Sequence, residues 1–286
     1  MPATTITTVH GEALVEKDVD FGTGGGRELR VDIYSPANNP GNAPCILQIH
    51  GGGWRMGARD MPGMVAFGTL LSQRGYVCVS AEYRLSGEAP WPAQIHDAKA
   101  ALRWTRANAT GLGIDPNRVS LLGKSAGAHI ALMMAATQDD PAYEGDGGTP
   151  GVSTAFSSAL TFYPPTRMAR RGIAASDAVK ALMGTNHNEA ALLEISPLEH
   201  VGKKAFPPTL LLHGNKDVVV SPGDSTAMYE ALNKAGVPVE LHMYAGLPHG
   251  FDNEAPHYQR QCADIIDLFV KAHVPYRVPP QSTVAL

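Results

Sequence analysis

The five residues Gly-Lys-Ser-Ala-Gly, from Gly123 to Gly127, constrain the fold of this chain more than any other segment. They follow a short apolar run at 119–122 and precede a helical pattern of small residues at 126–136. Glycines on both sides of the serine allow a sharp turn, because larger side chains there would collide with the adjoining strand and helix. The segment predicts a strand, a tight turn and a helix, which is the nucleophile elbow that exposes the Ser125 hydroxyl beside a helix N-terminus.

Such a pentapeptide also occurs by chance in ordinary loops, where the serine merely caps a helix. The interpretation as a nucleophile therefore depends on three partners in a fixed order along the chain. An oxyanion-binding loop must come before the serine, and an acid followed by a histidine must come after it.

Composition excludes several classes of function. The chain has 286 residues, of which 44% are hydrophobic and 17% charged, as is usual for a compact soluble enzyme. A net charge of −4 is too small to indicate nucleic-acid binding. No apolar run approaches the roughly 20 residues of a membrane span, and the first residues lack the pattern of a signal peptide. No His/Cys spacing indicates a metal and no glycine-rich loop indicates a nucleotide, so no cofactor is expected.

Three cysteines, Cys45, Cys78 and Cys262, lie within apolar patterns and are predicted to be buried thiols. Buried free thiols favour a cytoplasmic protein. Cys45 and Cys78 lie on strands that could be neighbours, which leaves a disulfide between them as the one alternative.

Strand-like and helical patterns alternate along the chain, which predicts a single α/β domain over residues 1–286 with a mostly parallel sheet between helices. Residues 165–206 interrupt the alternation with short helix-like pieces and are predicted to form a small cap over the site. The predicted strands are 14–21, 28–34, 45–49, 76–80, 209–212 and 239–244, and the clearest helices are 95–102, 228–235 and 262–269.

The segment His50-Gly51-Gly52-Gly53-Trp54 directly follows an apolar strand. Its glycines can turn backbone N–H groups into a cleft at little steric cost. Fixed N–H donors stabilise the negative charge that develops on the carbonyl oxygen during acyl transfer. The candidate oxyanion donors are Gly52, Gly53 and Ala126.

Asp217 and His249 are the predicted acid and base. Asp217 follows a buried strand, where a carboxylate can orient an imidazole, and His249 lies in the loop between the last strand and the last helix. Asp224 is a weaker candidate because it suits a helix N-cap, and Asp252 lies too close in sequence to the histidine. The order Ser125, Asp217, His249 completes the required set.

At this point the chain resembles the α/β-hydrolase superfamily. It is most similar to hormone-sensitive-lipase-type carboxylesterases and to the smaller acetyl-esterase-like, feruloyl-esterase-like and kynurenine-formamidase-like hydrolases. The resemblance covers about residues 13–273 and implies the α/β-hydrolase fold with an eight-stranded sheet and hydrolysis through an acyl-enzyme. The matching pieces are the glycine loop at 50–54, Tyr83-Arg84-Leu85, Pro92-Ala93 with Asp97, residues 123–129, Asp217, and Leu247-Pro248-His249-Gly250-Phe251.

The leading hypothesis is a serine carboxylesterase acting on small-molecule carboxylic esters. An amidase, a formamidase or a peptidase could use the same residues, and a non-catalytic receptor on a hydrolase fold is a further alternative. Trp54, Tyr163 and Phe251 are candidate substrate-binding residues, each weighed against plain core packing. Lys124 stands where the resembling families usually carry an acidic residue or a histidine, and it is expected to be solvated or salt-bridged. A homodimer is possible, with the last strand and the last helix as its interface.

Overall fold

The computed structural model describes residues 7–10, 13–184, 187–253 and 255–274. After four consecutive strands in residues 7–49, helices and strands alternate along the chain, as the sequence predicts. The strands are β1 (Thr7–His10), β2 (Ala13–Gly24), β3 (Arg27–Pro36), β4 (Ala43–Ile49), β5 (Val77–Ala81), β6 (Ile114–Lys124), β7 (Ala159–Phe162), β8 (Thr209–Gly214) and β9 (Val239–Tyr244). The main helices are α1 (Pro62–Ser72), α2 (Ala93–Ala107), α3 (Ala109–Leu112), α4 (Ala126–Ala136), α8 (Pro222–Lys234) and α9 (Pro256–His273).

The described strands form one sheet in the order β1-β2-β3-β5-β4-β6-β7-β8-β9. Neighbours from β5 to β9 pair in parallel, whereas β1, β2, β3 and β5 pair antiparallel. The predicted eight-stranded, mostly parallel sheet is confirmed in β2 to β9, and the short strand β1 extends its antiparallel edge.

A tight hairpin joins β2 to β3. Gly24 pairs with Arg27, so that Gly25 and Gly26 alone make the turn, with φ of 58° and 84°. Two consecutive positive φ values fit the right-handed twist of the two strands, and glycine adopts them without a Cβ clash. Gly25 and Gly26 are therefore suited to this two-residue turn.

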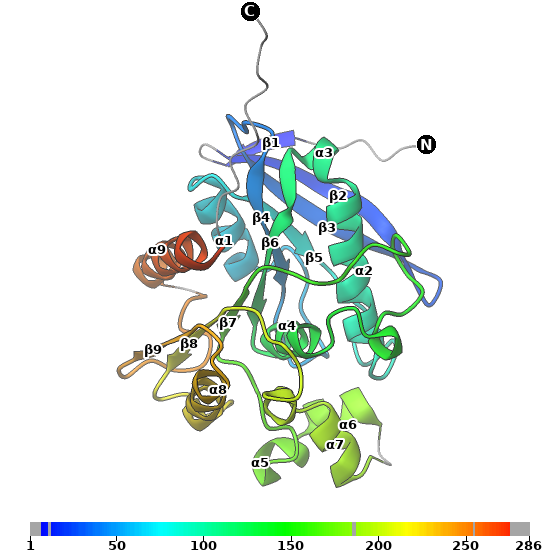
Figure 1. Ribbon diagram of the computed structural model, residues 1–286, viewed down its shortest axis with the longest axis vertical. Helices are drawn as coiled ribbons and strands as arrows, with labels where there is room; N and C mark the ends of the chain where they lie inside the picture. The colour runs from blue at the N-terminus through cyan, green and yellow to red at the C-terminus, as the bar shows by residue number, and fades with distance from the viewer. Residues whose placement is uncertain (1–6, 11–12, 185–186, 254, 275–286) are drawn as a thin grey trace, which may run out of the picture.

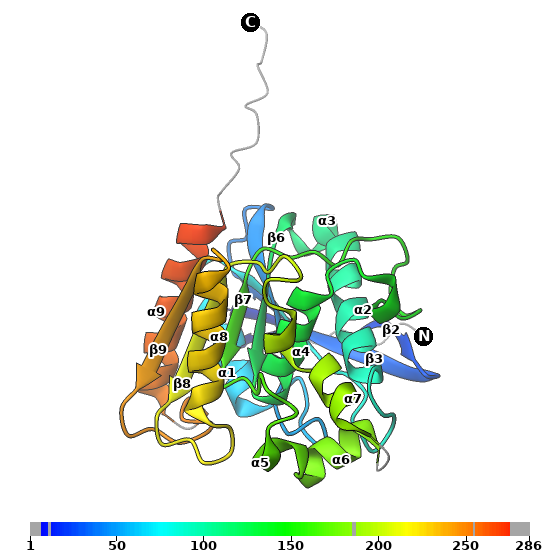
Figure 2. The same cartoon turned by 60° about the horizontal axis from the view of Figure 1, so that its bottom comes forward.

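Helices cover both faces of the sheet (Figures 1 and 2). One apolar cluster packs α1 and α9 against one face, and a larger cluster packs α2, α4 and α8 against the other. Residues of each buried strand alternate between the two clusters, as Leu121 and Leu122 of β6 do. Since both faces are covered, the central strands are continuously apolar, which is why they read as short hydrophobic runs in the sequence.

The three cysteines are buried and unbonded. In the parallel pair of β4 and β5, Cys45 lies opposite Val77 while Cys78 lies opposite Ile46. The two thiols belong to opposite faces of the sheet, one in each apolar cluster. A disulfide between them is therefore excluded by register, and the prediction of buried thiols is confirmed.

Residues 165–206 contain the short helices α5 (Arg171–Ala174), α6 (Asp177–Met183) and α7 (Glu189–Glu194) and the 3₁₀ turn η2 (Pro197–His200). Both views show α5, α6 and α7 gathered at one end of the molecule, beyond α4 (Figures 1 and 2). Among the residues described, no helix is both long enough and apolar enough to cross a bilayer.

Candidate active site

Ser125 lies between the end of β6 and the start of α4, with φ of 52° and ψ of −115°. This conformation is costly for a residue with a Cβ and persists where the surroundings enforce it. Here the Ser125 N–H donates to the Phe162 carbonyl at 2.9 Å. A Cβ on Gly127 would overlap the carbonyl oxygen of Ile49, and one on Gly123 would lie 2.6 Å from the Gly127 carbonyl carbon. The backbone thus forms the predicted elbow, and close packing explains both of its glycines.

The structure brings the three predicted triad residues together. His249 Nε2 lies 2.9 Å from Ser125 Oγ, and His249 Nδ1 lies 2.6 Å from Asp217 Oδ2. With a proton on Nδ1, the ring donates to the carboxylate and leaves a lone pair on Nε2 for the serine proton. The serine comes from the elbow, the aspartate from the loop after β8, and the histidine from the loop after β9. All three loops lie at the carboxyl ends of the strands, where open α/β sheets bind ligands.

Asp217 is held by four hydrogen bonds. Its Oδ1 accepts from the backbone N–H groups of Val219 and Val220, both at 2.8 Å, and its Oδ2 faces both His249 and His213. Burial alone would raise the pKa of this carboxyl, but the bonds from His213, His249 and Val220 outweigh it and the pKa lies below its usual range. The carboxylate therefore stays ionised and fixed beside the imidazole.

His213 is a second histidine in contact with Asp217. Its Nε2 lies 3.1 Å from Asp217 Oδ2, and its Nδ1 lies 2.7 Å from the Ser225 hydroxyl. The ring is fully buried at the end of β8. Its place in a strand pattern gave no sign of this role, because the partner Asp217 is reached only when the chain turns after the strand.

Two backbone carbonyl groups of the glycine loop after β4, those of Gly51 and Gly52, accept hydrogen bonds from residues of the same segment. Gly52 and Gly53 have φ of 113° and 61°, and the Gly52 carbonyl accepts the N–H groups of Arg55 and Met56. His50 braces the loop, since its Nδ1 donates to the Gly51 carbonyl at 2.7 Å and its ring stacks on Tyr83 at 4.2 Å. Glycine is required at position 52, where φ is 113° and a Cβ would overlap the carbonyl oxygen of Met56.

A pocket of about 330 Å³ lies over Ser125. Its walls come from the glycine loop, the first turn of α1, the elbow and the histidine loop. The lining residues are Gly51, Gly52, Gly53, Met61, Gly63, Met64, Lys124, Ser125, Tyr163, Val219, His249, Gly250 and Asn253. The volume suits a small ligand.

Comparison with known proteins agrees with this geometry. The family described as BD-FAE matches residues 31–232. The chain belongs to the BD-FAE family.

Curated relatives of this BD-FAE protein are named esterases. The chain is 32% identical over 264 residues to esterase LipQ of Mycobacterium tuberculosis, a match that covers 88% of the chain and 61% of LipQ. It is 33% identical to carboxylesterase NlhH of the same species, with 80% of the chain and 72% of NlhH covered. The chain thus spans about two thirds of the length of these relatives.

A solved structure, the apo form of Thermogutta terrifontis esterase 2, superposes with a TM-score of 0.74 at 28% identity and covers 94% of this chain and 97% of that one. The fold class and the esterase resemblance inferred from the sequence are both confirmed.

The three candidate substrate-binding residues lie in different surroundings. Tyr163 lines the pocket, and its ring centroid is 4.3 Å from that of His249. Trp54 is buried edge-on against His129 at 5.2 Å, and Phe251 is buried beside Tyr244 at 4.7 Å. Neither Trp54 nor Phe251 is among the residues that line the described pocket. Binding roles for all three stay predictions.

The weaker alternatives for the acid have other partners. Asp224 lies in the first turn of α8 and accepts from Arg167 Nε at 2.8 Å. Ser221, rather than Asp224, caps that helix. Asp252 accepts from the Tyr163 hydroxyl at 2.8 Å and pairs with Lys124. Lys124 is therefore salt-bridged, as expected, but buried rather than solvated.

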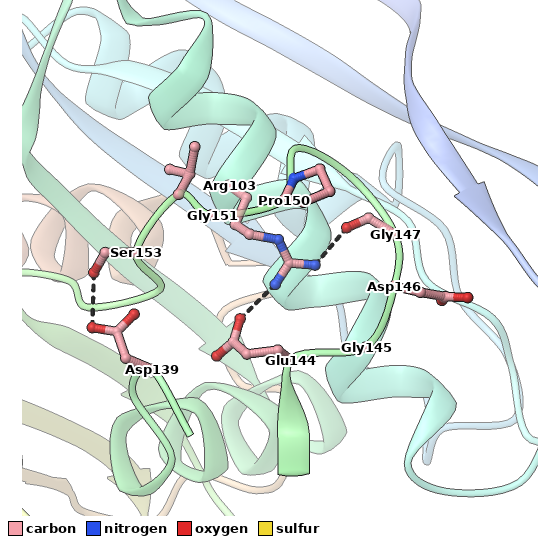
Figure 3. Close-up of a pocket in the computed structure, with 10 residues that line it drawn as sticks. Arg103, Asp139, Glu144, Gly145, Asp146, Gly147, Pro150, Gly151 and Ser153 are labelled. Atoms are coloured by element: carbon pink, nitrogen blue, oxygen red, sulfur yellow. Dashed lines mark hydrogen bonds and ion pairs between the residues drawn. The ribbon is translucent and has the colours of Figure 1, made fainter. Parts of the chain in front are cut away.

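A second and larger cavity, of about 610 Å³, lies between α2 and the loop at 139–153 (Figure 3). Arg103 reaches across it to Glu144 and to the Gly147 carbonyl, while Asp139 accepts from Ser153. Asp146 points away from the other labelled side chains. The bonds from Arg103 to Glu144 and to the Gly147 carbonyl hold the loop against α2, so these groups are already paired with one another. The smaller pocket over Ser125 is the candidate active site.

Within the described ranges, no cluster of three or more His, Cys, Asp or Glu side chains is arranged to hold a metal ion.

Proposed function

We propose that this BD-FAE protein is a serine carboxylesterase that hydrolyses small carboxylic esters through an acyl-enzyme. The observation that carries the proposal is the hydrogen-bonded series Ser125–His249–Asp217, with bonds of 2.9 and 2.6 Å, inside a pocket of about 330 Å³. The esterase names of its relatives agree with it.

Ser125 is the proposed nucleophile. As its Oγ attacks the ester carbonyl carbon, His249 Nε2 takes the hydroxyl proton, and Asp217 stabilises the imidazolium that forms. His249 then gives this proton to the leaving alkoxide, which departs as the alcohol. A water molecule attacks the acyl-enzyme in the same way, and the proton returned by His249 restores Ser125.

The backbone N–H groups of Gly52, Gly53 and Ala126 are the proposed oxyanion donors. Ala126 is the first residue of α4, so its N–H is one of those left free at a helix N-terminus. The positive φ values of Gly52 and Gly53 are consistent with N–H groups that face the pocket. Each donor of this kind lowers an acyl-transfer barrier by about 3 kcal/mol.

The test is hydrolysis of p-nitrophenyl acetate by the wild type and by Ser125→Ala. We expect the substitution to lower kcat by about 10⁶-fold, as removal of the nucleophile does in other triad enzymes. Wild-type rates in Ser125→Ala would disprove the assignment. A panel of acyl lengths, with matched amides and formyl-kynurenine beside the esters, separates an esterase from an amidase or formamidase. Failure of a fluorophosphonate probe to label Ser125 would favour a non-catalytic receptor.

Residues 165–206 are proposed to cap this site within a single domain. A Cβ built on Gly53 would lie 3.6 Å from Ala178 Cβ of α6, which supports close packing of that helix on the glycine loop. The Leu182 carbonyl of the same helix accepts the Trp91 N–H at 2.8 Å. If α6 limits the acyl or alcohol site, Ala178→Phe will raise KM more for bulky esters than for acetate. An equal change for all esters would count against the cap.

A homodimer is also proposed, on the exposed Met243 of edge strand β9 and Leu268 of α9, which are 39% and 68% exposed. Light scattering at micromolar concentration tests it, and a monomer mass would refute it.

The three free, buried cysteines support a proposed cytoplasmic location. Fractionation of the native cells tests that location, and recovery of the protein outside the cytoplasm would refute it.

A further inference from the structure

A buried ion pair joins the nucleophile elbow to the histidine loop. Lys124 is the last residue of β6 and the chain neighbour of Ser125. Its ammonium pairs with Asp252 and donates to Asn253 Oδ1 at 2.7 Å. These two partners are the third and fourth residues after His249.

The pair is buried on both sides. The Lys124 side chain is 5% exposed and the Asp252 side chain 0%. A buried charge without a partner is strongly unfavourable, so each of these groups restricts where the other can lie. The rings of Phe67 and Phe162 flank the ammonium at 5.6 and 5.8 Å from their centroids, which leaves little room for a displaced lysine.

Asp252 is also tied to the other side of the site. Its Oδ1 accepts from the Tyr163 hydroxyl at 2.8 Å, and the Tyr163 ring packs against the His249 ring. The Phe162 carbonyl, one residue before Tyr163, accepts the N–H of Ser125. One carboxylate thus receives bonds from a neighbour of the serine and from the aromatic ring that packs on the histidine.

Helix α1 is shaped to fit this pair. Gly63 lies in its first turn, and a Cβ there would overlap the Lys124 ammonium and lie 2.7 Å from Asn253 Oδ1. Met61 and Met64, on either side, line the pocket. The glycine therefore leaves space for the lysine and its amide partner under the helix.

We infer that the Lys124–Asp252 ion pair is a positioning device that holds the His249 loop against the nucleophile elbow, so that His249 Nε2 stays within hydrogen-bond reach of Ser125. Lys124 is then a positioning residue that acts through His249. The inference rests on the proposed esterase function and adds to it a requirement for the residue that precedes the nucleophile.

The test measures kcat and KM for p-nitrophenyl acetate in Lys124→Met and Lys124→Arg, each made in the wild type and in His249→Ala. We expect Lys124→Met to lower kcat by about 10²-fold, the loss typical of a displacement of about 1 Å in a catalytic group. KM should change little, and Lys124→Arg should recover most of kcat because it keeps the charge. In His249→Ala, Lys124→Met should change the remaining rate by no more than about twofold, since residues that act through one another are not additive.

Lys99→Met is the matched control. Lys99 is equally buried and pairs with Glu144 at 2.7 Å, but it lies on α2 beside the larger cavity and does not line the pocket over Ser125. Its loss should lower the unfolding temperature and leave kcat close to that of the wild type. If Lys99→Met lowers kcat as much as Lys124→Met does, the effect of Lys124 is one of stability and the inference is wrong.

Other outcomes separate the two proposals. If the wild type hydrolyses the ester, His249→Ala does not, and Lys124→Met keeps the wild-type kcat, the esterase stands and the positioning role is refuted. An equal loss in both backgrounds also refutes it, because Lys124 would then act independently of His249. An inactive wild type refutes both proposals.

If Lys124→Met does not fold, the double variant Lys124→Met/Asp252→Asn removes both charges and takes its place. This folded variant should still show the lowered kcat, because the tie between the loops is gone. Gly63→Ala keeps both charges and displaces them, and it should lower kcat in the same way. Wild-type kcat in the folded double variant refutes the inference.

Discussion

Asp217→Asn should abolish most activity while leaving the structure intact. The substitution changes one carboxylate oxygen to an NH₂ group, and the surroundings decide which one. Oδ1 accepts two backbone N–H groups at 2.8 Å, from Val219 and Val220. Backbone N–H groups can only donate, whereas an imidazole nitrogen can also accept, so the amide oxygen takes the Oδ1 position and the NH₂ group faces His249 and His213.

The orientation then reverses the histidine tautomer. Two hydrogen bonds from backbone N–H groups to the neutral amide oxygen, at about 0.5–1.5 kcal/mol each, favour this amide orientation. His249 Nδ1, now opposite a donor, must become an acceptor, and its proton moves to Nε2, where the base has to be free to accept from Ser125. We expect kcat to fall by about 10⁴-fold, as the same change does in a serine protease, which is about 5.4 kcal/mol at about 1.36 kcal/mol for each tenfold.

The assay is steady-state hydrolysis of p-nitrophenyl acetate, with circular dichroism to confirm folding. Asp224→Asn is the control, because Asp224 is also a fully buried carboxylate, paired with Arg167 instead of a histidine. It should keep most of the wild-type kcat. A folded Asp217→Asn enzyme with more than about a tenth of the wild-type kcat would refute the tautomer argument, since that loss is under about 1.4 kcal/mol.

Two further predictions concern stability. Gly127→Ala places a Cβ against the Ile49 carbonyl and 2.5 Å from the His50 carbonyl oxygen, so it should lower the free energy of unfolding by at least about 1–3 kcal/mol in urea titrations. Gly87→Ala, which meets nothing within 4 Å, should be neutral, and equal effects would contradict the packing argument. Burial lowers the pKa of His50 and His129 to about 4, so the unfolded chain takes up protons first as the pH falls from about 6.5. Stability should therefore drop by about 1.4 kcal/mol per pH unit for each ring between about pH 6.5 and 4, and an unchanged urea midpoint at pH 5 would argue against it.

The sequence predicted those parts of the molecule that depend on local pattern. The elbow at Ser125 is specified by two glycines within five residues. Buried parallel strands read as apolar runs because both of their faces are covered. The order of serine, aspartate and histidine was also readable, and the structure brings these side chains within hydrogen-bond distance, although their catalytic roles stay predictions.

The contacts that the sequence could not predict join residues far apart in the chain. Lys124 donates to Asn253, 129 residues away, and nothing near either residue indicates that both lie under α1. The contact of His213 with Asp217 could not be predicted because the chain turns after β8 before it reaches Asp217. The space that Gly63 leaves for a lysine is visible only when β6, α1 and the histidine loop are assembled.

The buried cysteines have a practical consequence. Burial raises the pKa of all three thiols, so they are poor nucleophiles toward maleimide reagents in the folded protein. Val218, next to Asp217, is 95% exposed. A cysteine introduced at position 218 would be labelled selectively without removal of any native thiol. A fluorophore there would be attached next to Val219, which lines the pocket over Ser125, and should report the arrival of substrate and the departure of product in real time.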